Sequence, residues 1–152
     1  MDAFYDEMTL AQARDLLREL VVEGVHCPLC TRYAKVYKRT INSGMAQSLI
    51  VMYRTNGLQW QHVPTTVGRS SAEEGKLAYW GLIEGEIERR PDGGRPGVWR
   101  VTEKGKSFLE CWTTVKKYAT VYDGRVLDIS GPEISIVDAL GKKFNYRELM
   151  ED

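Results

Sequence analysis

Residues 77–110 constrain the fold of this chain more than any other stretch. Gly81 follows a helical run, and because glycine adopts left-handed backbone angles without strain, it suits the end of a helix. Apolar and acidic residues alternate over residues 82–89, which is the period of a half-buried β-strand. Prolines and glycines are concentrated in residues 91–97, so the chain must reverse there before a short return strand around Trp99.

A helix is predicted directly after the return strand. Thr102 is a favoured N-cap residue, and Glu103 places a carboxylate where the helix dipole stabilises negative charge. Phe108, Leu109 and Trp112 have the spacing of one apolar helix face. This stretch therefore predicts, in order, a helix end, a strand, a turn, a second strand and a second helix.

Three segments of this stretch, "GLIE", the basic turn and "VWRVTEKGKSFL", resemble the wing and the following helix of winged-helix transcription regulators of the MarR and PadR kind. The resemblance covers the middle third of the chain and implies a winged helix-turn-helix core that binds duplex DNA. It also implies that the helix ending at Trp80 lies in the major groove and that Arg95 reaches the DNA backbone or minor groove. The sequence departs from the family between Gly57 and Gly81, where it predicts one helix and the family usually has two.

The composition predicts a protein that folds without disulfides. A chain of 152 residues with 43% hydrophobic residues can bury a core of ordinary size. Three cysteines, the lack of a signal-peptide pattern and the lack of an apolar run of roughly 20 residues predict a reduced, cytoplasmic protein with no membrane span.

The formal net charge is zero, so a nucleic-acid function would depend on local concentrations of positive charge. Residues 25–72 contain six lysine and arginine residues and no acidic residue. Basic residues there alternate with Tyr33 and Tyr37, which is typical of surfaces that contact phosphates and stack on bases. The alternative is a solvated strand whose tyrosines pack on a neighbouring helix. The predicted nucleic-acid-binding residues are Arg32, Lys35, Lys38, Arg39, Arg69, Ser70, Ser71, Lys76, Arg95 and Arg100.

Acidic residues near the predicted DNA-binding elements oppose this interpretation. Glu73 and Glu74 fall in the first turn of the helix in the recognition position, where they would repel phosphates. Glu84 and its acidic neighbours could pair with the arginines across the predicted hairpin. The alternative function is therefore a winged-helix scaffold that binds a protein partner.

The N-terminal part is predicted to be a helix followed by a cysteine knuckle. Thr9 and Gln12 have the spacing of a capping box, and an apolar helical pattern continues until Gly24. His26 precedes the motif "CPLC", and a strand is predicted over residues 33–39.

The pair Cys27 and Cys30 is half of a zinc-ribbon site, because two thiolates on a tight turn can bind one side of a tetrahedral ion. The remaining candidate ligands are His62, Cys111 and the sterically awkward His26. One interpretation is a Zn²⁺ site formed by Cys27, Cys30 and His62 with Cys111 or water, and another is a site shared across a dimer. The alternative is a metal-free turn with buried thiols and no cofactor. Thioredoxin-like redox chemistry is disfavoured, because the motif does not join a strand to a helix.

The region before Gly81 is predicted to contain a helix, a short strand and a second helix. The first helix opens at Ser43, buries Tyr53 among its apolar residues and ends at Gly57. A strand over residues 58–62 would end at Pro64. Ser71 and Glu74 form a capping box for the helix that continues to Trp80.

The C-terminal part is predicted to be a β-hairpin followed by further short elements. Asp123 and Gly124 suit a two-residue type I′ turn. Residues 130–132 should turn the chain again, with a new strand starting at Ile134 and Ile136. Asn145 and Glu148 indicate the start of a last short helix.

The sequence as a whole predicts an α+β protein with a winged helix-turn-helix core, an N-terminal helix and cysteine knuckle, and a C-terminal β-hairpin appendage. The corresponding ranges are 1–39, 40–112 and 113–152. No catalytic arrangement of residues is present, so we expect a regulator or accessory protein that binds double-stranded DNA, with a homodimer as one form. The composition also resembles short phage and prophage proteins, for which binding to host machinery is the alternative.

Overall fold

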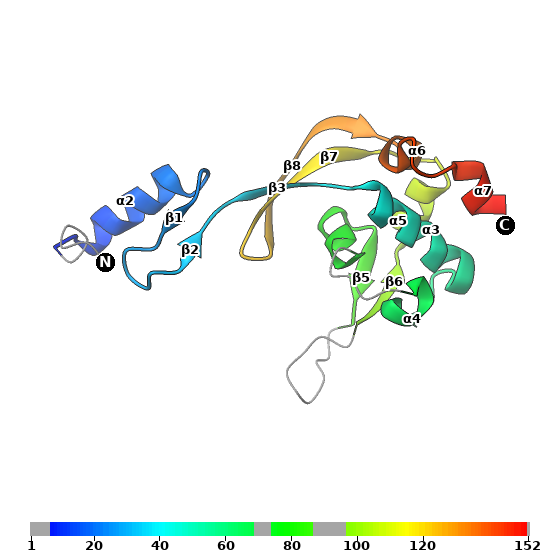
Figure 1. The fold of residues 1–152 in the computed structure, drawn as a ribbon, viewed down its shortest axis with the longest axis horizontal. Coiled ribbons are helices and arrows are strands. Elements are labelled where there is room, and N and C mark those ends of the chain that lie inside the picture. Colours follow the sequence, from blue (N-terminus) through cyan, green and yellow to red (C-terminus); the bar gives the residue numbers. More distant parts are fainter. Residues whose placement is uncertain (1–6, 69–73, 87–96, 152) are drawn as a thin grey trace. The chain divides into compact units, whose positions relative to one another are not determined.

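The computed structural model describes residues 7–68, 74–86 and 97–151. It is a mixed α+β structure that contains helices and antiparallel sheets (Figure 1). Contacts divide the chain into two compact units. Unit 1 comprises residues 1–39 and 120–128, and unit 2 comprises residues 40–119 and 129–152.

Unit 1 begins with helix α2, Leu10–Leu20. The Gln12 amide donates to Thr9 Oγ1 at 3.1 Å, and the Thr9 amide donates to Gln12 Oε1 at 2.9 Å. This capping box satisfies amides that the start of a helix would leave unpaired. Gly24 has a φ of 107° and leads into the next strand. The predicted first helix and its cap are confirmed.

Two short strands follow, β1 (Val25–His26) and β2 (Tyr33–Ala34), which pair in antiparallel fashion. The prediction of one strand over residues 33–39 is wrong. The Val36 amide donates to Val21 O at 2.9 Å, at the end of helix α2, so the backbone leaves the sheet between β2 and β3.

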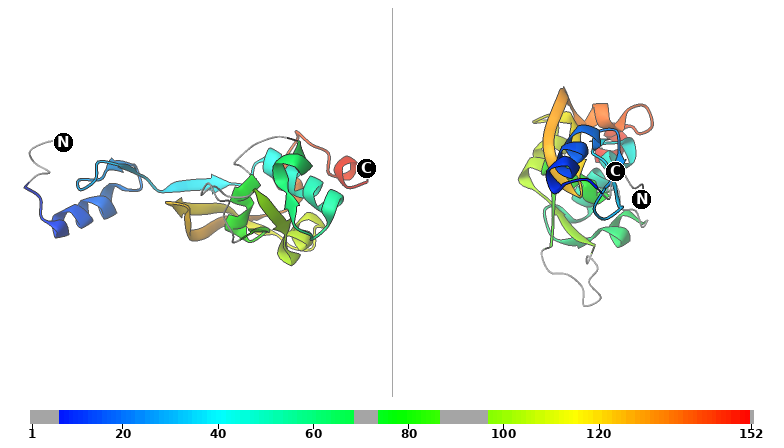
Figure 2. Two further views of the ribbon diagram at one scale, coloured as in Figure 1. Left: turned by 90° about the horizontal axis from the view of Figure 1, so that it is seen from below. Right: turned by 90° about the vertical axis from the view of Figure 1, so that its left-hand side faces the viewer.

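A three-stranded sheet has the order β3–β7–β8, with strands Tyr37–Thr40, Val115–Tyr122 and Arg125–Ile134. Strands β7 and β8 run side by side in Figures 1 and 2. Asp123 and Gly124 join them with φ values of 49° and 73°, and positive φ at both positions is the requirement of a type I′ turn. The predicted hairpin is confirmed.

Strand β8 continues through the residues predicted to turn the chain. It is an edge strand, where the missing amide hydrogen of Pro132 costs no sheet hydrogen bond. Gly131 has a φ of 93°, and a Cβ there would lie 2.5 Å from Cδ2 of Tyr118. The predicted turn at residues 130–132 is therefore wrong, because edge position and a glycine against an aromatic ring allow the strand to continue.

Helix α6, Ile136–Leu140, stands where a strand was predicted. The Asp138 amide donates to Ser135 Oγ at 3.1 Å, and the Ser135 amide donates to Asp138 Oδ2 at 2.9 Å. This capping box starts the helix, and Ile136, Ala139 and Leu140 are buried on it. The final helix α7, Tyr146–Glu151, was predicted correctly, and the Glu148 amide donates to Asn145 Oδ1 at 3.1 Å.

Helix α3, Ser43–Asn56, is at the centre of unit 2 (Figure 1). Asn42 caps its N-terminus, since Oδ1 accepts from the Met45 amide at 2.8 Å, and Gly57 ends it with a φ of 60°. The helix contacts α4 (Val63–Val67), the 3₁₀ helix η1 (Glu74–Trp80), α5 (Glu103–Leu109), α6 and α7. Its fully buried residues are Met45, Ala46, Ser48, Leu49, Ile50 and Met52, whereas Tyr53 is only half-buried.

The second sheet of unit 2 has the order β4–β6–β5, with strands Gln61–His62, Val98–Val101 and Ile83–Gly85. Both pairings are antiparallel, and β6 lies between its neighbours. The strands before and after the predicted turn are thus confirmed in residues 83–85 and 98–101. Residues 87–96, where the turn is predicted, lie outside the described residues.

Between Gly57 and Gly81 the described residues, 57–68 and 74–81, already contain two helical segments, so the prediction of one helix is wrong. Pro64 lies in the first turn of α4, where a proline needs no amide hydrogen, and does not simply end a strand. The strand predicted for residues 58–62 is limited to Gln61–His62.

Helix α5 begins as predicted, because Thr102 Oγ1 accepts from the Gly105 amide at 3.0 Å. It ends at Leu109, and Cys111 follows with a φ of 66°. Trp112 is therefore outside the helix and 81% exposed, so its predicted place on the apolar face is wrong.

Candidate functional sites

The turn between β1 and β2 carries the two cysteines of unit 1. The Cys27 amide donates to Arg32 O at 2.8 Å, and the Thr31 amide donates to Cys27 O at 2.9 Å. Thr31 has a φ of 65°, which helps the chain reverse within so few residues. These contacts define the geometry of the turn from both ends.

Backbone amides surround the Cys27 sulfur. The Leu29 amide donates to Cys27 Sγ at 3.4 Å. Hydrogen bonding from the Cys30 backbone, followed by that from Leu29, lowers the pKa of Cys27. Cys27 is half-buried and Cys30 is exposed, so the prediction of a turn with buried thiols is wrong.

The other predicted metal ligands have local partners. His62 Nδ1 lies 2.7 Å from Thr65 Oγ1 at the start of α4, in unit 2. His26 Nδ1 lies 3.1 Å from Thr31 O. Cys111 follows α5, also in unit 2. Among residues 7–68, 74–86 and 97–151, no three His, Cys, Asp or Glu side chains come together as a metal site.

Among the basic and aromatic residues that follow the cysteine turn, Arg32, Tyr33, Tyr37 and Lys38 are exposed, and Lys35 and Arg39 are half-buried. Tyr33 and Tyr37 are 55% and 41% exposed, so they are not packed beneath a neighbouring helix as the alternative required. Lys35 Nζ lies 5.5 Å from the Tyr37 ring centroid, and Arg39 Cζ lies 4.7 Å from it. This arrangement places two cations beside one exposed aromatic ring.

A hollow in unit 1 is lined by residues of both the cysteine turn and the predicted basic strand, which the sequence analysis treated as separate sites. The sequence did not indicate that the loop of the β7–β8 hairpin would contribute to it, because that loop is about ninety residues away along the chain. Residues that line the hollow are Cys27, Cys30, Arg32, Tyr33, Lys35, Tyr37, Tyr122 and Asp123.

In unit 2, Arg100 is engaged within its own sheet. It lies opposite Glu84 in the β5–β6 pairing and forms an ion pair with that carboxylate. Its guanidinium carbon lies 4.5 Å from the Trp60 ring centroid. The alternative in which acids pair with arginines across the hairpin is thus realised at this position.

Glu74 was predicted to repel phosphates, but in the structure its side chain does not face the solvent. Its side chain is 2% exposed, and Ser48 Oγ donates to Glu74 Oε1 at 3.2 Å. The carboxylate therefore faces the core of unit 2. Lys76 is half-buried on the same 3₁₀ helix. The other predicted residues of this region, Arg69, Ser70, Ser71, Glu73 and Arg95, lie outside the described residues.

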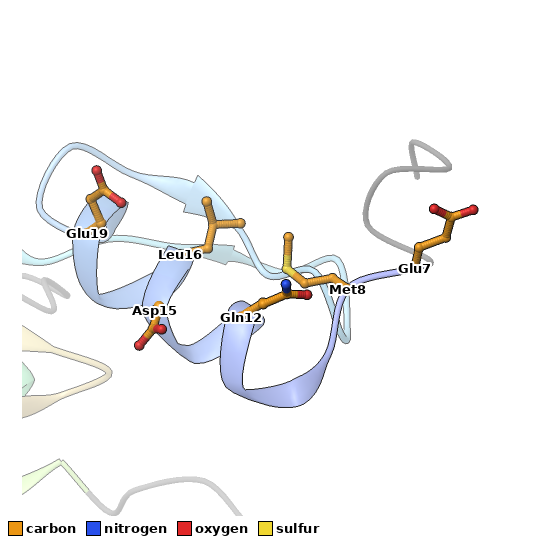
Figure 3. A pocket seen from close by; sticks show the side chains of 6 residues that line it. All are labelled: Glu7, Met8, Gln12, Asp15, Leu16 and Glu19. Atoms are coloured by element: carbon orange, nitrogen blue, oxygen red, sulfur yellow. The ribbon is translucent and has the colours of Figure 1, made fainter.

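A second hollow of unit 1 is acidic. Figure 3 shows Glu7, Asp15 and Glu19 among the side chains that line it along α2. Negative side chains repel phosphate groups, so this face of α2 is unsuited to contact nucleic acid.

Neither protein-family models, nor curated proteins, nor solved structures give a match to this chain. The resemblance to winged-helix regulators therefore remains a prediction from the residues. Among the described residues, no helix combines the length and apolarity needed to cross a membrane.

Proposed function

We propose that unit 2 is a winged helix-turn-helix domain that binds duplex DNA. The observation that carries this proposal is the order of its elements, which is helix α3, strand β4, helices α4 and η1, strand β5 and strand β6. The sheet order β4–β6–β5 places the return strand in the middle, as a wing between β5 and β6 requires. The second helix of the motif, α4, supplies the element that the sequence pattern lacked.

In this proposal η1 and the residues before it occupy the recognition position. Burial of Glu74 against Ser48 leaves one carboxylate fewer near the phosphates than the sequence indicated. Arg69, Ser70, Ser71 and Lys76 would approach the groove, because backbone amides and cations at this end of a helix suit an anion.

In this proposal, the two arginines of the wing have different roles. Arg95, in the segment between β5 and β6, would contact phosphate or the minor groove. Arg100, at its base, pairs with Glu84 and stacks on Trp60, so it positions the wing and contributes little charge to DNA. The basic segment of unit 1, with Arg32, Lys35, Lys38 and Arg39, adds further phosphate contacts.

Arg95→Glu tests this assignment. We expect the variant to bind a random-sequence duplex at least about tenfold more weakly, because it removes one phosphate contact and adds a repelled charge. Fluorescence anisotropy at low salt measures the affinity, and thermal unfolding should be unchanged.

Arg147→Glu is the matched control, since Arg147 is an exposed arginine on α7 and has no assigned DNA contact. Equal effects of the two substitutions would show that only net charge matters and would argue against a wing that touches DNA.

A second candidate function is protein binding. Two features favour it. Arg100 is already paired with Glu84. The edge strand β8 carries Val126 and Leu127, whose side chains are 39% and 58% exposed. An edge strand with apolar side chains can pair with an extended segment of a partner. Affinity capture that recovers one stoichiometric partner, from a chain that does not bind DNA, would favour this alternative.

A further inference from the structure

We propose that Cys27 and Cys30 are two of the four ligands of a tetrahedral Zn²⁺ site, and that the same two cysteines of a second copy of the chain complete it. This proposal is independent of DNA binding. Two thiols that lie three residues apart on one turn have the spacing of half a structural zinc site. The chain has no second such pair.

Local contacts fix the conformation of the turn that carries the two cysteines. Strands β1 and β2 flank it, with Val25 opposite Ala34 and His26 opposite Tyr33. The amide of Leu29 already points at Cys27 Sγ, at 3.4 Å. Hydrogen bonds of this kind orient ligand sulfur atoms and disperse their negative charge when a metal is bound.

A single chain does not supply the third and fourth ligands of this zinc site. All of its cysteines and histidines lie in the described residues, and no set of three potential ligands comes together there. His26 is turned toward Thr31 O, and His62 is held by Thr65. Structural zinc sites take four protein ligands, so a half-site requires ligands from another molecule.

A second copy meets this requirement through the same residues. In a two-fold symmetric interface each chain presents the same patch to the other, so one cysteine pair meets its equivalent and four thiolates surround the metal. Cys30 is exposed, and the side chain of Leu29 between the cysteines is 65% exposed, so the turn is accessible.

The charges around the turn also suit this site. Four thiolates around Zn²⁺ carry a net charge of about −2, which needs compensation from the protein. Arg32 and Lys35 line the same hollow as the two cysteines and provide two positive charges from each chain. Asp123 also lines the hollow, so the net contribution is about +1 from each chain, which offsets the charge of the metal centre when two chains meet.

The test is metal binding by the full chain in a reducing buffer, with Co²⁺ as a spectroscopic probe and Zn²⁺ for stoichiometry. We expect the visible absorption bands of tetrahedral, thiolate-bound Co²⁺, and one Zn²⁺ per two chains by elemental analysis. Sedimentation should show a metal-loaded dimer, and chelation should remove the metal and return the chains to monomers. No tetrahedral Co²⁺ spectrum, or one Zn²⁺ per chain, would overturn the shared site.

Substitutions identify the ligands. Cys27→Ser and Cys30→Ser should each abolish the Co²⁺ spectrum, whereas Cys111→Ser, a control that removes a thiol from unit 2, should leave it intact. Loss of the spectrum in Cys111→Ser or in His62→Ala would place those residues in the site and contradict the symmetric arrangement. Circular dichroism of each variant separates loss of metal from loss of fold, and the wild-type spectrum decides the question if a variant does not fold.

Discussion

The role of Arg100 follows from its contacts in the structure and not from its charge. By sequence it lies near the glycine-rich turn, and it was predicted, with Arg95, to contact DNA. In the structure it touches both Glu84 and Trp60, which lie on either side of it in unit 2. Its guanidinium is therefore occupied by neighbours in the same sheet.

These contacts predict a stability effect. Arg100→Ala should lower the free energy of unfolding by about 0.5–1 kcal/mol, since exposed ion pairs and exposed cation–π contacts are each worth less than about 1 kcal/mol. Chemical denaturation of Arg100→Ala, Trp60→Ala and the double variant measures the coupling between the two side chains. Strictly additive effects would contradict a contact of energetic value.

Tyr146 gives a prediction with a defined pH dependence. Its hydroxyl donates to Leu109 O at 2.8 Å, and burial, together with the nearby Cys111 thiol and Glu110 carboxylate, raises its pKa to about 12 from a usual value of 10.0. Tyr146→Phe removes this hydrogen bond, so stability near pH 7 should fall by about 1 kcal/mol.

The difference between Tyr146→Phe and the wild type should then shrink above pH 10. Between pH 10 and 12 the unfolded chain loses the phenol proton while the folded protein keeps it, so wild-type stability falls as pH rises through this window. The phenylalanine variant has no proton to lose there. Urea denaturation at pH 8, 10 and 11 measures the difference, and a constant difference would contradict the raised pKa.

At the scale of elements, helix α5 packs closely against the start of β5 and the end of β6. A Cβ on Gly105 would lie 2.1 Å from Leu82 O and 2.9 Å from Val101 Cγ1. Gly105 is buried, so this contact cannot be relieved by moving into solvent. The glycine therefore sets the distance between the helix and the sheet.

Gly105→Ala should destabilise unit 2 by about 1–3 kcal/mol, the usual cost of overpacking a core. Lys104→Ala, at the exposed neighbouring position, is the control and should have little effect. Thermal and chemical unfolding compare the two variants. An alanine at position 105 that is tolerated as well as the one at position 104 would contradict the close approach.

Elements with short-range signals were predicted well, and elements that depend on distant neighbours were not. Thr9 with Gln12, Thr102, and Asp123 with Gly124 each make their contacts within a few residues, so the sequence alone indicates the helix or turn. Helix α4 has five residues, which is too short to show a helical period.

The remaining errors come from tertiary context. Pro132 is tolerated because β8 is at a sheet edge, and no local pattern indicates an edge. Glu74 is buried, and its hydrogen-bond partner Ser48 lies 26 residues earlier in the chain. The same limitation applies to the sites: the cysteine turn was predicted from its motif, whereas its shared hollow with Tyr122 and Asp123 depends on the hairpin.

For the whole molecule, each unit carries its own set of residues that we propose to contact DNA. Unit 1 carries the cysteine turn and the basic residues that follow it, and unit 2 carries the elements that we propose to be a winged helix. With a formal charge of zero, the chain has no general attraction to DNA, so any binding must come from local groups of cations. The number of phosphates that these cations contact is therefore the quantity that distinguishes the two candidate functions.

That number is given by the salt dependence of binding to a random-sequence duplex, measured by fluorescence anisotropy at several salt concentrations. Each phosphate contact contributes about 0.9 to the slope of log affinity against log salt. We expect a slope of several units, because the proposed wing, the recognition segment and the basic segment of unit 1 each contribute contacts. No binding at low salt, or a slope near zero, would contradict DNA binding by this protein.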